Sequence, residues 1–282
     1  MTRTFIEIDT GRARPYILEI TNQELPLRGL PESFHGATMV HLTDLHGGYG
    51  NTDAVHQEAI RRVNAVAADI ILFTGDYIDD HKDIKDYPIE ETLGQFRARL
   101  GLFGSFGNHD HRRGVTGTRR KLEAAGVRVL NNESVCIASG LHVAGVDDIF
   151  EGKPDIDLAF RDIPDHITPI VLSHSPRLIE RVSRRYAQVL SGHTHGGQIC
   201  LTFPTPKMVC MAHLRCRQVA GWYHNGLASL YVNRGLGVTG RPFRYRCPAE
   251  IAIFRLIPDP HEDHARHVEA ERRRHAREAV RA

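Results

Sequence analysis

The sequence predicts an α/β protein in which two β-sheets pack face to face and helices cover their outer faces. From about Met39, short apolar runs alternate with amphipathic stretches, a pattern that indicates strands alternating with helices. In the second half of the chain, strand-like runs follow one another closely. Two sets of strands flanked by helices bury their apolar faces when the sheets stack and the helices lie outside.

The first half of the chain contains three successive units that each end in a polar turn. Residues 39–42, 69–73 and 101–106 are predicted strands, and residues 52–68 and 89–100 are predicted helices, the first capped by Thr52 or Asp53. The strands end at Asp44, Asp76 and Asn108, respectively. Because the carboxyl ends of strands line the ligand crevice of an open α/β sheet, we expect these turns to converge on one site.

The second half is richer in strands. A predicted helix at 118–125 is stopped by Gly126, and another at 176–185 opens with Pro176 in its first turn. Predicted strands occupy 127–130, 135–138, 141–146, 167–172, 187–190, 230–232 and 251–256. Because the sequence shows no internal repeat and no low-complexity linker, we expect residues 1–258 to form one domain. The charged tail, residues 259–282, is expected to be a solvated helix or a frayed end.

Composition narrows the function classes. The 282 residues are 41% hydrophobic, and 36 Lys and Arg against 34 Asp and Glu give a net charge of +2, so bulk electrostatics do not indicate a nucleic-acid partner. The five cysteines form no C-x-x-C pair, which suits a reducing compartment. Metal binding by Cys210, His213 and Cys216 is an alternative, but we favour the interpretation that these thiols are small packing residues. We expect no secretory signal and no membrane-spanning helix, because the N-terminus is polar and apolar runs stay below ~18 residues.

Metal-type ligands follow several of the predicted strands. Any one of them has an ordinary explanation, since a Gly-Asp pair is typical of turns and a single histidine is more often a satisfied core residue. Together they supply oxygen and imidazole donors without thiolate, a set that suits Mn²⁺, with Zn²⁺ or iron as alternatives. The clusters are Asp44 and His46; Asp76; Asn108, His109 and Asp110; His174; and His193 and His195.

The order of these motifs resembles that of the calcineurin-like metallophosphoesterases. The matching series is Asp44-x-His46, Gly75-Asp76, Gly107-Asn108-His109-Asp110, His174 and Gly192-His193-Thr194-His195, within a core of about 37–257. The runs 192–198, 235–240 and 247–251 resemble a bacterial branch that includes membrane-associated phosphoesterases and UDP-2,3-diacylglucosamine hydrolases. The resemblance implies a four-layer α/β/β/α sandwich with two mixed sheets and a centre of two divalent metal ions.

The resemblance also implies a role for each site residue. Asp44, His46 and His195 would hold one ion, Asn108, His174 and His193 the other, and Asp76 would bridge both. A hydroxide shared by the ions would attack phosphorus in line. His109 would be the catalytic acid and Asp110 would orient its ring. For substrate phosphate, the residues considered are Arg112, Arg113, Asn233 and Arg234, although a surface role is as consistent with each arginine.

The leading hypothesis is therefore hydrolysis of a phosphodiester or pyrophosphate bond in a small or lipid-linked substrate, such as UDP-2,3-diacylglucosamine. A phosphomonoesterase or cyclic-nucleotide phosphodiesterase is the main alternative, and a non-catalytic scaffold is a further one. The apolar segment 199–211 follows the last histidines and is interpreted either as a wall for an acyl chain or as a packing flap. The polar start predicts a cytoplasmic protein, with peripheral contact at the inner membrane surface.

Overall fold

Two mixed sheets form the centre of the molecule. The computed structural model describes residues 1–11, 15–50, 52–81, 87–138, 140–202, 206–208 and 216–260. The first sheet has the order β1-β2-β15-β3-β4-β5-β6 and the second β13-β14-β10-β9-β8-β7. A small hairpin of β11 and β12 lies apart from both.

The first sheet is parallel on the side that carries the predicted turns. Strands β3 to β6 run parallel to one another, β15 is antiparallel to β3, and β1 is antiparallel to β2. The strands are β1 (Thr2–Ile8), β2 (Tyr16–Leu27), β3 (Thr38–Leu42), β4 (Ile70–Phe73), β5 (Leu102–Gly104), β6 (Val127–Val129) and β15 (Ala249–Pro258).

The second sheet has a parallel centre and antiparallel edges. Strands β8, β9, β10 and β14 are parallel, and β7 and β13 pair antiparallel at the two edges. The strands are β7 (Glu133–Ile137), β8 (Leu141–Gly145), β9 (Ile170–Leu172), β10 (Ala187–Ser191), β13 (Gly221–Asn225) and β14 (Ala228–Val232), with β11 (Cys200–Thr202) and β12 (Pro206–Met208) outside the sheet.

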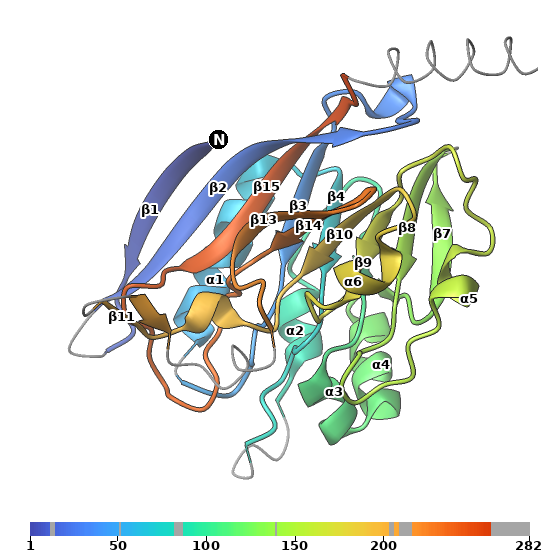
Figure 1. The fold of residues 1–282 in the computed structure, drawn as a ribbon. Helices are drawn as coiled ribbons and strands as arrows, with labels where there is room; N and C mark the ends of the chain where they lie inside the picture. Colours follow the sequence, from blue (N-terminus) through green and yellow to red (C-terminus); the bar gives the residue numbers. More distant parts are fainter. Residues whose placement is uncertain are drawn as a thin grey trace, which may run out of the picture.

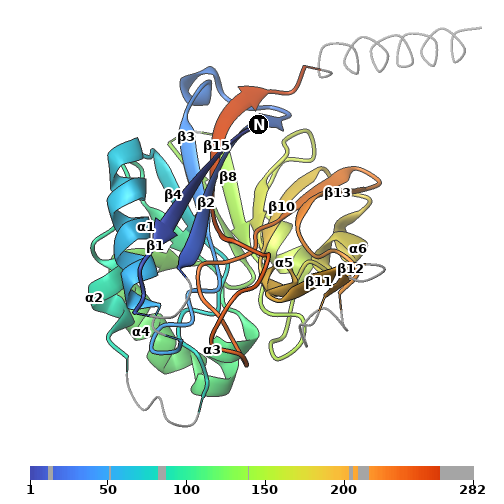
Figure 2. The same ribbon diagram turned by 90° about the vertical axis from the view of Figure 1, so that its left-hand side faces the viewer.

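Helices cover the outer face of each sheet, which confirms the predicted sandwich. Viewed along the layers, α1, α2 and α4 lie on one side and α5 and α6 on the other, with the two sheets between them (Figures 1 and 2). The helices are α1 (Asp53–Val66), α2 (Ile89–Leu93), α3 (Asn108–Arg113), α4 (Val115–Ala124), α5 (Ile156–Phe160) and α6 (Leu178–Val182).

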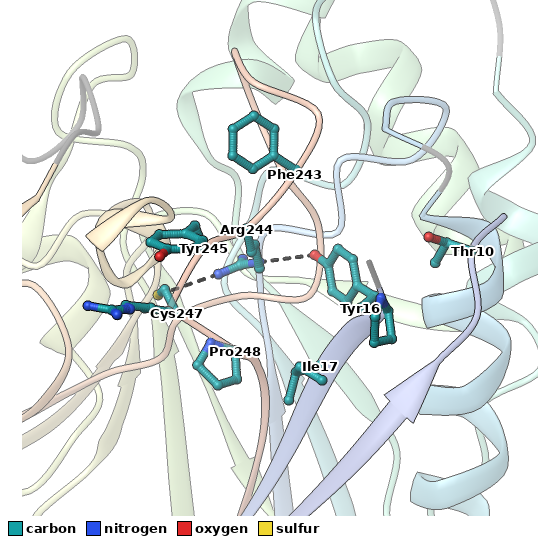
Figure 3. A pocket seen from close by; sticks show the side chains of 10 residues that line it. Thr10, Tyr16, Ile17, Phe243, Arg244, Tyr245, Cys247 and Pro248 are labelled. Atoms are coloured by element: carbon teal, nitrogen blue, oxygen red, sulfur yellow. Dashed lines mark hydrogen bonds between the residues drawn. The ribbon is translucent and has the colours of Figure 1, made fainter. Parts of the chain in front are cut away.

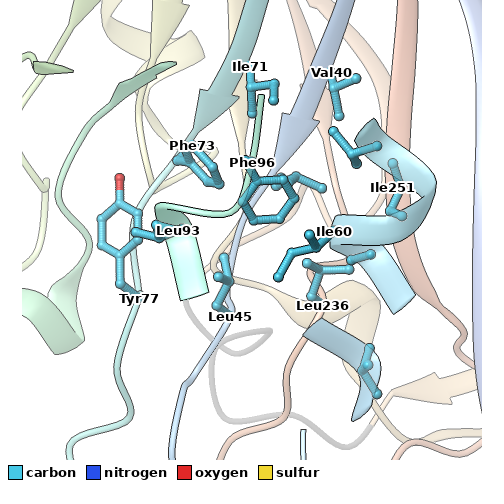
Figure 4. Packing of buried hydrophobic residues seen from close by; sticks show 14 of the residues in the cluster. Val40, Leu45, Ile60, Ile71, Phe73, Tyr77, Leu93, Phe96, Leu236 and Ile251 are labelled. Carbon is cyan, nitrogen blue, oxygen red and sulfur yellow. The ribbon is translucent and has the colours of Figure 1, made fainter. Parts of the chain in front are cut away.

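Alternating side chains on the strands build three separate hydrophobic clusters between these layers. On β4, Ile71 and Phe73 pack in the cluster beneath the first helices, whereas Ile70 and Leu72 pack between the sheets. Figure 4 shows the first of these clusters. A third cluster lies between the second sheet and its helices. The strand-like runs are continuously apolar because both faces of these strands are buried.

The N-terminal hairpin of β1 and β2 lies outside the predicted motif-bearing core of residues 37–257. Strand β2 pairs in parallel with β15 over its length, from Leu18 opposite Ala249 to Leu27 opposite Pro258. The hairpin therefore extends the first sheet on the side away from β3. The predicted helix at 89–100 is shorter than expected, because it ends at Gly94 and the chain then turns Phe96 into the core. Residues 261–282 of the predicted tail lie outside the described residues.

Candidate metal centre

The candidate ligands all follow the carboxyl ends of strands, and several have an unusual backbone conformation. The φ angles of Asp44, His46, Asp76, His193 and His195 are 50°, 46°, 54°, 70° and 52°. Non-glycine residues in this left-handed region cost of order 1–3 kcal/mol each and persist only where the surroundings hold them. Strain of this kind gathers at functional sites, and here it falls on residues that the motifs had already singled out.

The first group of donors joins the two sheets. Nε2 of His195, after β10, lies 3.3 Å from Oδ1 of Asp44, after β3. Nε2 of His46 lies 3.0 Å from Nε2 of His195 and 3.9 Å from the same Asp44 oxygen. The three side chains are buried and close enough to share one cation.

The second group contains Asp76, His174 and His193. Nε2 of His174 lies 2.9 Å from Oδ2 of Asp76, and the side-chain amide of Asn108 lies 2.8 Å from Nδ1 of His193. The same Asp76 oxygen is 3.7 Å from Nε2 of His46 in the first group. Asp76 therefore lies between the two groups.

Neighbouring acceptors fix how two of the histidine rings are turned. Nδ1 of His46 is 2.9 Å from Oδ2 of Asp79, and Nδ1 of His174 is 2.7 Å from the carbonyl oxygen of Thr74. Because each acceptor receives a hydrogen bond from Nδ1–H, the proton stays on Nδ1 and the neutral ring keeps a lone pair on Nε2. Histidines that bind metals are commonly oriented in this way.

Carboxylates and burial have opposite effects on the pKa values of the site histidines. Burial disfavours a charged imidazole, yet the carboxylates of Asp44 and Asp79 outweigh burial and raise the pKa of His46 to about 10. Asp76 has the same effect against burial at His174, whose pKa is also raised to about 10. Burial dominates at His193, where it lowers the pKa to about 3. The carboxylates that favour a charged imidazolium at His46 and His174 also favour a divalent cation beside these rings.

The donors fit divalent cations. They are carboxylate, amide and imidazole groups, as borderline and hard metals prefer. Nε2 of His193 is buried and has no hydrogen-bond partner among the described residues, an expensive arrangement unless the nitrogen binds something. Two motif glycines allow the close approach: a Cβ added at Gly107 would collide with the Asp76 carboxylate, and one at Gly192 with that of Asp44.

The predicted acid, His109, lies at the edge of the site, but its partner is not the expected one. Its Nδ1 is 2.7 Å from Oδ1 of Asp80, and Oδ2 of Asp80 is 2.6 Å from Nη1 of Arg112. Nε2 of His109 points back toward Asp76, 3.9 Å from Oδ2. The ring contact expected of Asp110 is thus made by Asp80.

Asp110 instead supports the backbone beneath Asp76. Its carboxylate accepts hydrogen bonds from the backbone N–H groups of Asp76 and Gly107, both at 2.8 Å, and of Tyr77 at 3.1 Å. Burial and the neighbouring Asp76 raise the pKa of Asp110 to about 6. These bonds help to hold the left-handed conformation of Asp76.

Of the residues considered for substrate phosphate, Arg112 lies beside the site, whereas Arg113, Asn233 and Arg234 are bonded to other parts of the fold. Arg112 is paired with Asp80, and 41% of its side chain is exposed. Arg113 donates to the carbonyl of Asp79, and Asn233 is buried, donating to the carbonyl of His41 and accepting from Gly235. Arg234 pairs with Glu19 at 2.6 Å and Glu250 at 3.0 Å.

Arg234 provides a test of whether this pairing serves the fold or the substrate. We expect Arg234→Met to lower the free energy of unfolding by about 3–5 kcal/mol, because it removes the cation shared by two buried carboxylates and leaves Glu19 with only the exposed Arg3, 3.3 Å away. Urea unfolding of the metal-free protein measures this loss. A variant of unchanged stability with a raised KM would instead indicate a contact with substrate.

Sequence reasoning did not single out Asp79 and Asp80. The signal was present, since both follow Asp76 within four residues in one acidic turn, but only the fold shows that this turn passes His46 and His109. Cys210 and His213 of the alternative ligand set lie outside the described residues, as do residues 203–205 and 209–211 of the apolar segment 199–211.

Comparisons with known proteins agree with this geometry. The family model for calcineurin-like phosphoesterases matches residues 37–214. An uncharacterized metallophosphoesterase of Bacillus subtilis, YkuE, is 31% identical over 86% of this chain and 86% of its own. An uncharacterized metallophosphoesterase of Helicobacter pylori is 33% identical over 88% of this chain and 65% of its own length. The UDP-2,3-diacylglucosamine pyrophosphatase LpxG of Chlamydia trachomatis is 26% identical over 87% of this chain and 91% of its own.

Among the described residues, no helix combines the length and the apolar character needed to cross a bilayer.

Proposed function

This chain belongs to the calcineurin-like phosphoesterase family, and on that basis we propose that it hydrolyses a phosphodiester or pyrophosphate bond with two divalent cations. The observation that carries the proposal is the position of Asp76, whose Oδ2 lies 2.9 Å from Nε2 of His174 and 3.7 Å from Nε2 of His46. One carboxylate between two sets of donors is the arrangement that brings two cations within reach of one phosphate.

Each donor has a place in this proposal. Asp44, His46 and His195 would hold one cation, and Asn108, His174 and His193 would hold the other, with Asp76 between the two groups. The chemistry that such cations would supply at these donors is activation of a water molecule near neutral pH and neutralisation of charge on the phosphoryl oxygens. Asp79 and the Thr74 carbonyl keep the histidine rings turned toward the cations. Mn²⁺ suits the donors best, with Zn²⁺ and iron as alternatives.

His109 and Arg112 act on the substrate itself. The Asp80 carboxylate accepts a hydrogen bond from Nδ1–H of His109 and so directs Nε2 toward the reaction centre, where Nε2–H donates a proton to the leaving oxygen. Arg112 lies next to this pair and to the Asn108 amide, and its guanidinium is partly exposed beside the donors. Its fork of donors suits a phosphoryl oxygen.

The substrate class that we favour is a nucleotide or lipid-linked pyrophosphate such as UDP-2,3-diacylglucosamine. The support is the named activity of the Chlamydia trachomatis relative, which this chain matches over most of its length. A cytoplasmic enzyme that touches the inner membrane surface is part of the same proposal, because a diacyl substrate resides in a membrane. Co-sedimentation with anionic lipid vesicles tests that contact.

A chelation and substrate-panel assay tests the reaction. We expect prolonged treatment with EDTA to remove hydrolysis and added Mn²⁺ to restore it, because the proposed nucleophile depends on the cations. Bis-p-nitrophenyl phosphate, p-nitrophenyl phosphate and a diacyl UDP-sugar should then be compared at equal enzyme concentration. The proposal expects the sugar to have the highest kcat/KM. Preference for the monoester would favour the phosphomonoesterase alternative, and activity that survives chelation would refute the mechanism.

A further inference from the structure

Arg244 lies before β15 and connects the metal centre to a neighbouring cavity of about 430 Å³. Figure 3 shows this arginine between the Tyr16 hydroxyl and the Cys247 sulfur, with a hydrogen bond to each. The Nε–O distance to Tyr16 is 3.0 Å. No sequence motif had marked this arginine.

The guanidinium of Arg244 bonds to two separate turns of the chain. Nη1 donates to the carbonyl of His195 at 3.1 Å, and Nη2 lies 3.4 Å from Nδ1 of the same ring. In the turn 234–237, Nη2 donates to the carbonyl oxygens of Arg234 and Gly237, both at 2.7 Å. One planar group therefore ties the His195 turn to the 234–237 turn.

The 234–237 turn in turn supports Asp44. The backbone N–H of Gly237 donates to the Asp44 carbonyl at 2.6 Å, and that of Leu236 donates to the Thr43 carbonyl at 3.0 Å. Asp44 and His195, two members of the first donor group, are thus connected through a single side chain.

We propose that Arg244 is a positioning residue for the first cation, the one held by Asp44, His46 and His195. The inference rests on the proposed function. Asp44 and His195 both have φ values in the left-handed region, so their turns need external support to persist. Arginine can provide it because its five N–H donors are fixed in one plane, whereas lysine has a single mobile ammonium.

The charge of Arg244 indicates that its role is geometric. A guanidinium beside the His195 ring repels a cation bound at that histidine, so electrostatic attraction cannot explain the placement. What the residue contributes is the fixed separation of the two turns. Loss of the side chain should therefore lower the affinity for the first cation and not for the second. Among the described interactions, no contact connects Arg244 to Asn108 or His174.

Metal binding, rather than turnover, gives the sharpest test. Mn²⁺ is titrated calorimetrically into chelator-treated wild type, Arg244→Met, Arg244→Lys and the control Arg246→Met, which alters the neighbouring arginine of the same cavity. We expect Arg244→Met to lower the affinity for one of the two ions by about 10–100-fold, the usual effect of removing support behind a ligand. The affinity for the other ion should be unchanged. Lysine should restore part of the affinity, and Arg246→Met should match wild type.

The titration also separates the possible failures. Equal weakening of both ions, or none, would overturn the inference while leaving the proposed function standing. A wild-type protein that binds no cation would overturn both. If Arg244→Met does not fold, as thermal unfolding of the metal-free protein will show, Tyr16→Phe replaces it. That variant removes the hydroxyl that accepts from Nε of Arg244 and donates to the Leu236 carbonyl at 2.6 Å, so it loosens the same connection between the guanidinium and the 234–237 turn. It should weaken binding of the same ion to a smaller extent, and unchanged affinity for both ions would then overturn the inference.

Discussion

Replacing Asp76 by alanine is expected to abolish hydrolysis and to reduce the bound metal clearly below two ions per chain. The carboxylate lies between both donor groups, so its loss removes a contact from each cation at once. It also removes the acceptor for the backbone N–H of His109, which lies 2.8 Å from Oδ1. Asp44 also approaches both groups, but its Oδ1 lies 3.3 Å from His195 and 3.9 Å from His174, whereas Asp76 lies 2.9 Å from His174 and 3.7 Å from His46. We therefore expect the Asp76 variant to be the most damaging one.

Metal content by elemental analysis and residual activity together test this expectation. Asp76→Asn serves as a second variant, because it keeps the size and the acceptor oxygen but not the charge. Glu58→Ala is the matched control: it removes a carboxylate that pairs with Arg61 on the surface of α1, and it should bind metal and turn over as wild type does. About two ions per chain in Asp76→Ala would show that this residue does not link the cations.

The architecture of the sandwich was largely predictable from the sequence, because the strands near the site are buried on both faces. A run such as Ile70-Ile71-Leu72-Phe73 is apolar at every position, and the polar turn after it marks the strand end sharply. The motifs then placed the candidate ligands on these turns. The structure brings them together from both sheets, as the distances between Asp44, His174 and His195 show.

The parts that escaped prediction depend on contacts between distant segments. Strand β2 gains its partner only when β15 returns from the far end of the chain, so its own sequence could not reveal its place in the sheet. Asp80 and Arg244 are similar cases, because each acts on a histidine 29 or 49 positions away. Asp110 is next to His109 in the sequence, which suggested a contact with the His109 ring. In α3, however, the Asp110 side chain points toward backbone N–H groups.

The His109→Ala variant is expected to keep both cations and to lose about 10²–10⁴-fold in kcat for a substrate with a poor leaving group, the usual contribution of a positioned general acid. His109 is not among the seven proposed ligands, and its Nε2 lies 3.9 Å from Asp76. The loss should be much smaller for a p-nitrophenyl ester, since that leaving group departs readily as an anion. The kcat of Asp80→Asn should lie between those of wild type and His109→Ala. This change weakens the hydrogen bond that orients the His109 ring but keeps the proton donor.

Steady-state kinetics with paired alkyl and p-nitrophenyl diesters measures this contrast, and metal analysis confirms that both ions remain. His224→Ala, a change on the exposed edge strand β13, provides the histidine control and should leave both rates unchanged. The comparison depends on the ratio of the two rate losses, so a general decrease in active protein cancels. Equal losses on both diesters would show that His109 does not donate the proton, and a fall in bound metal would make it a ligand. A selective loss on the alkyl diester, shared in weaker form by Asp80→Asn, would establish His109 and Asp80 as one proton-donating unit.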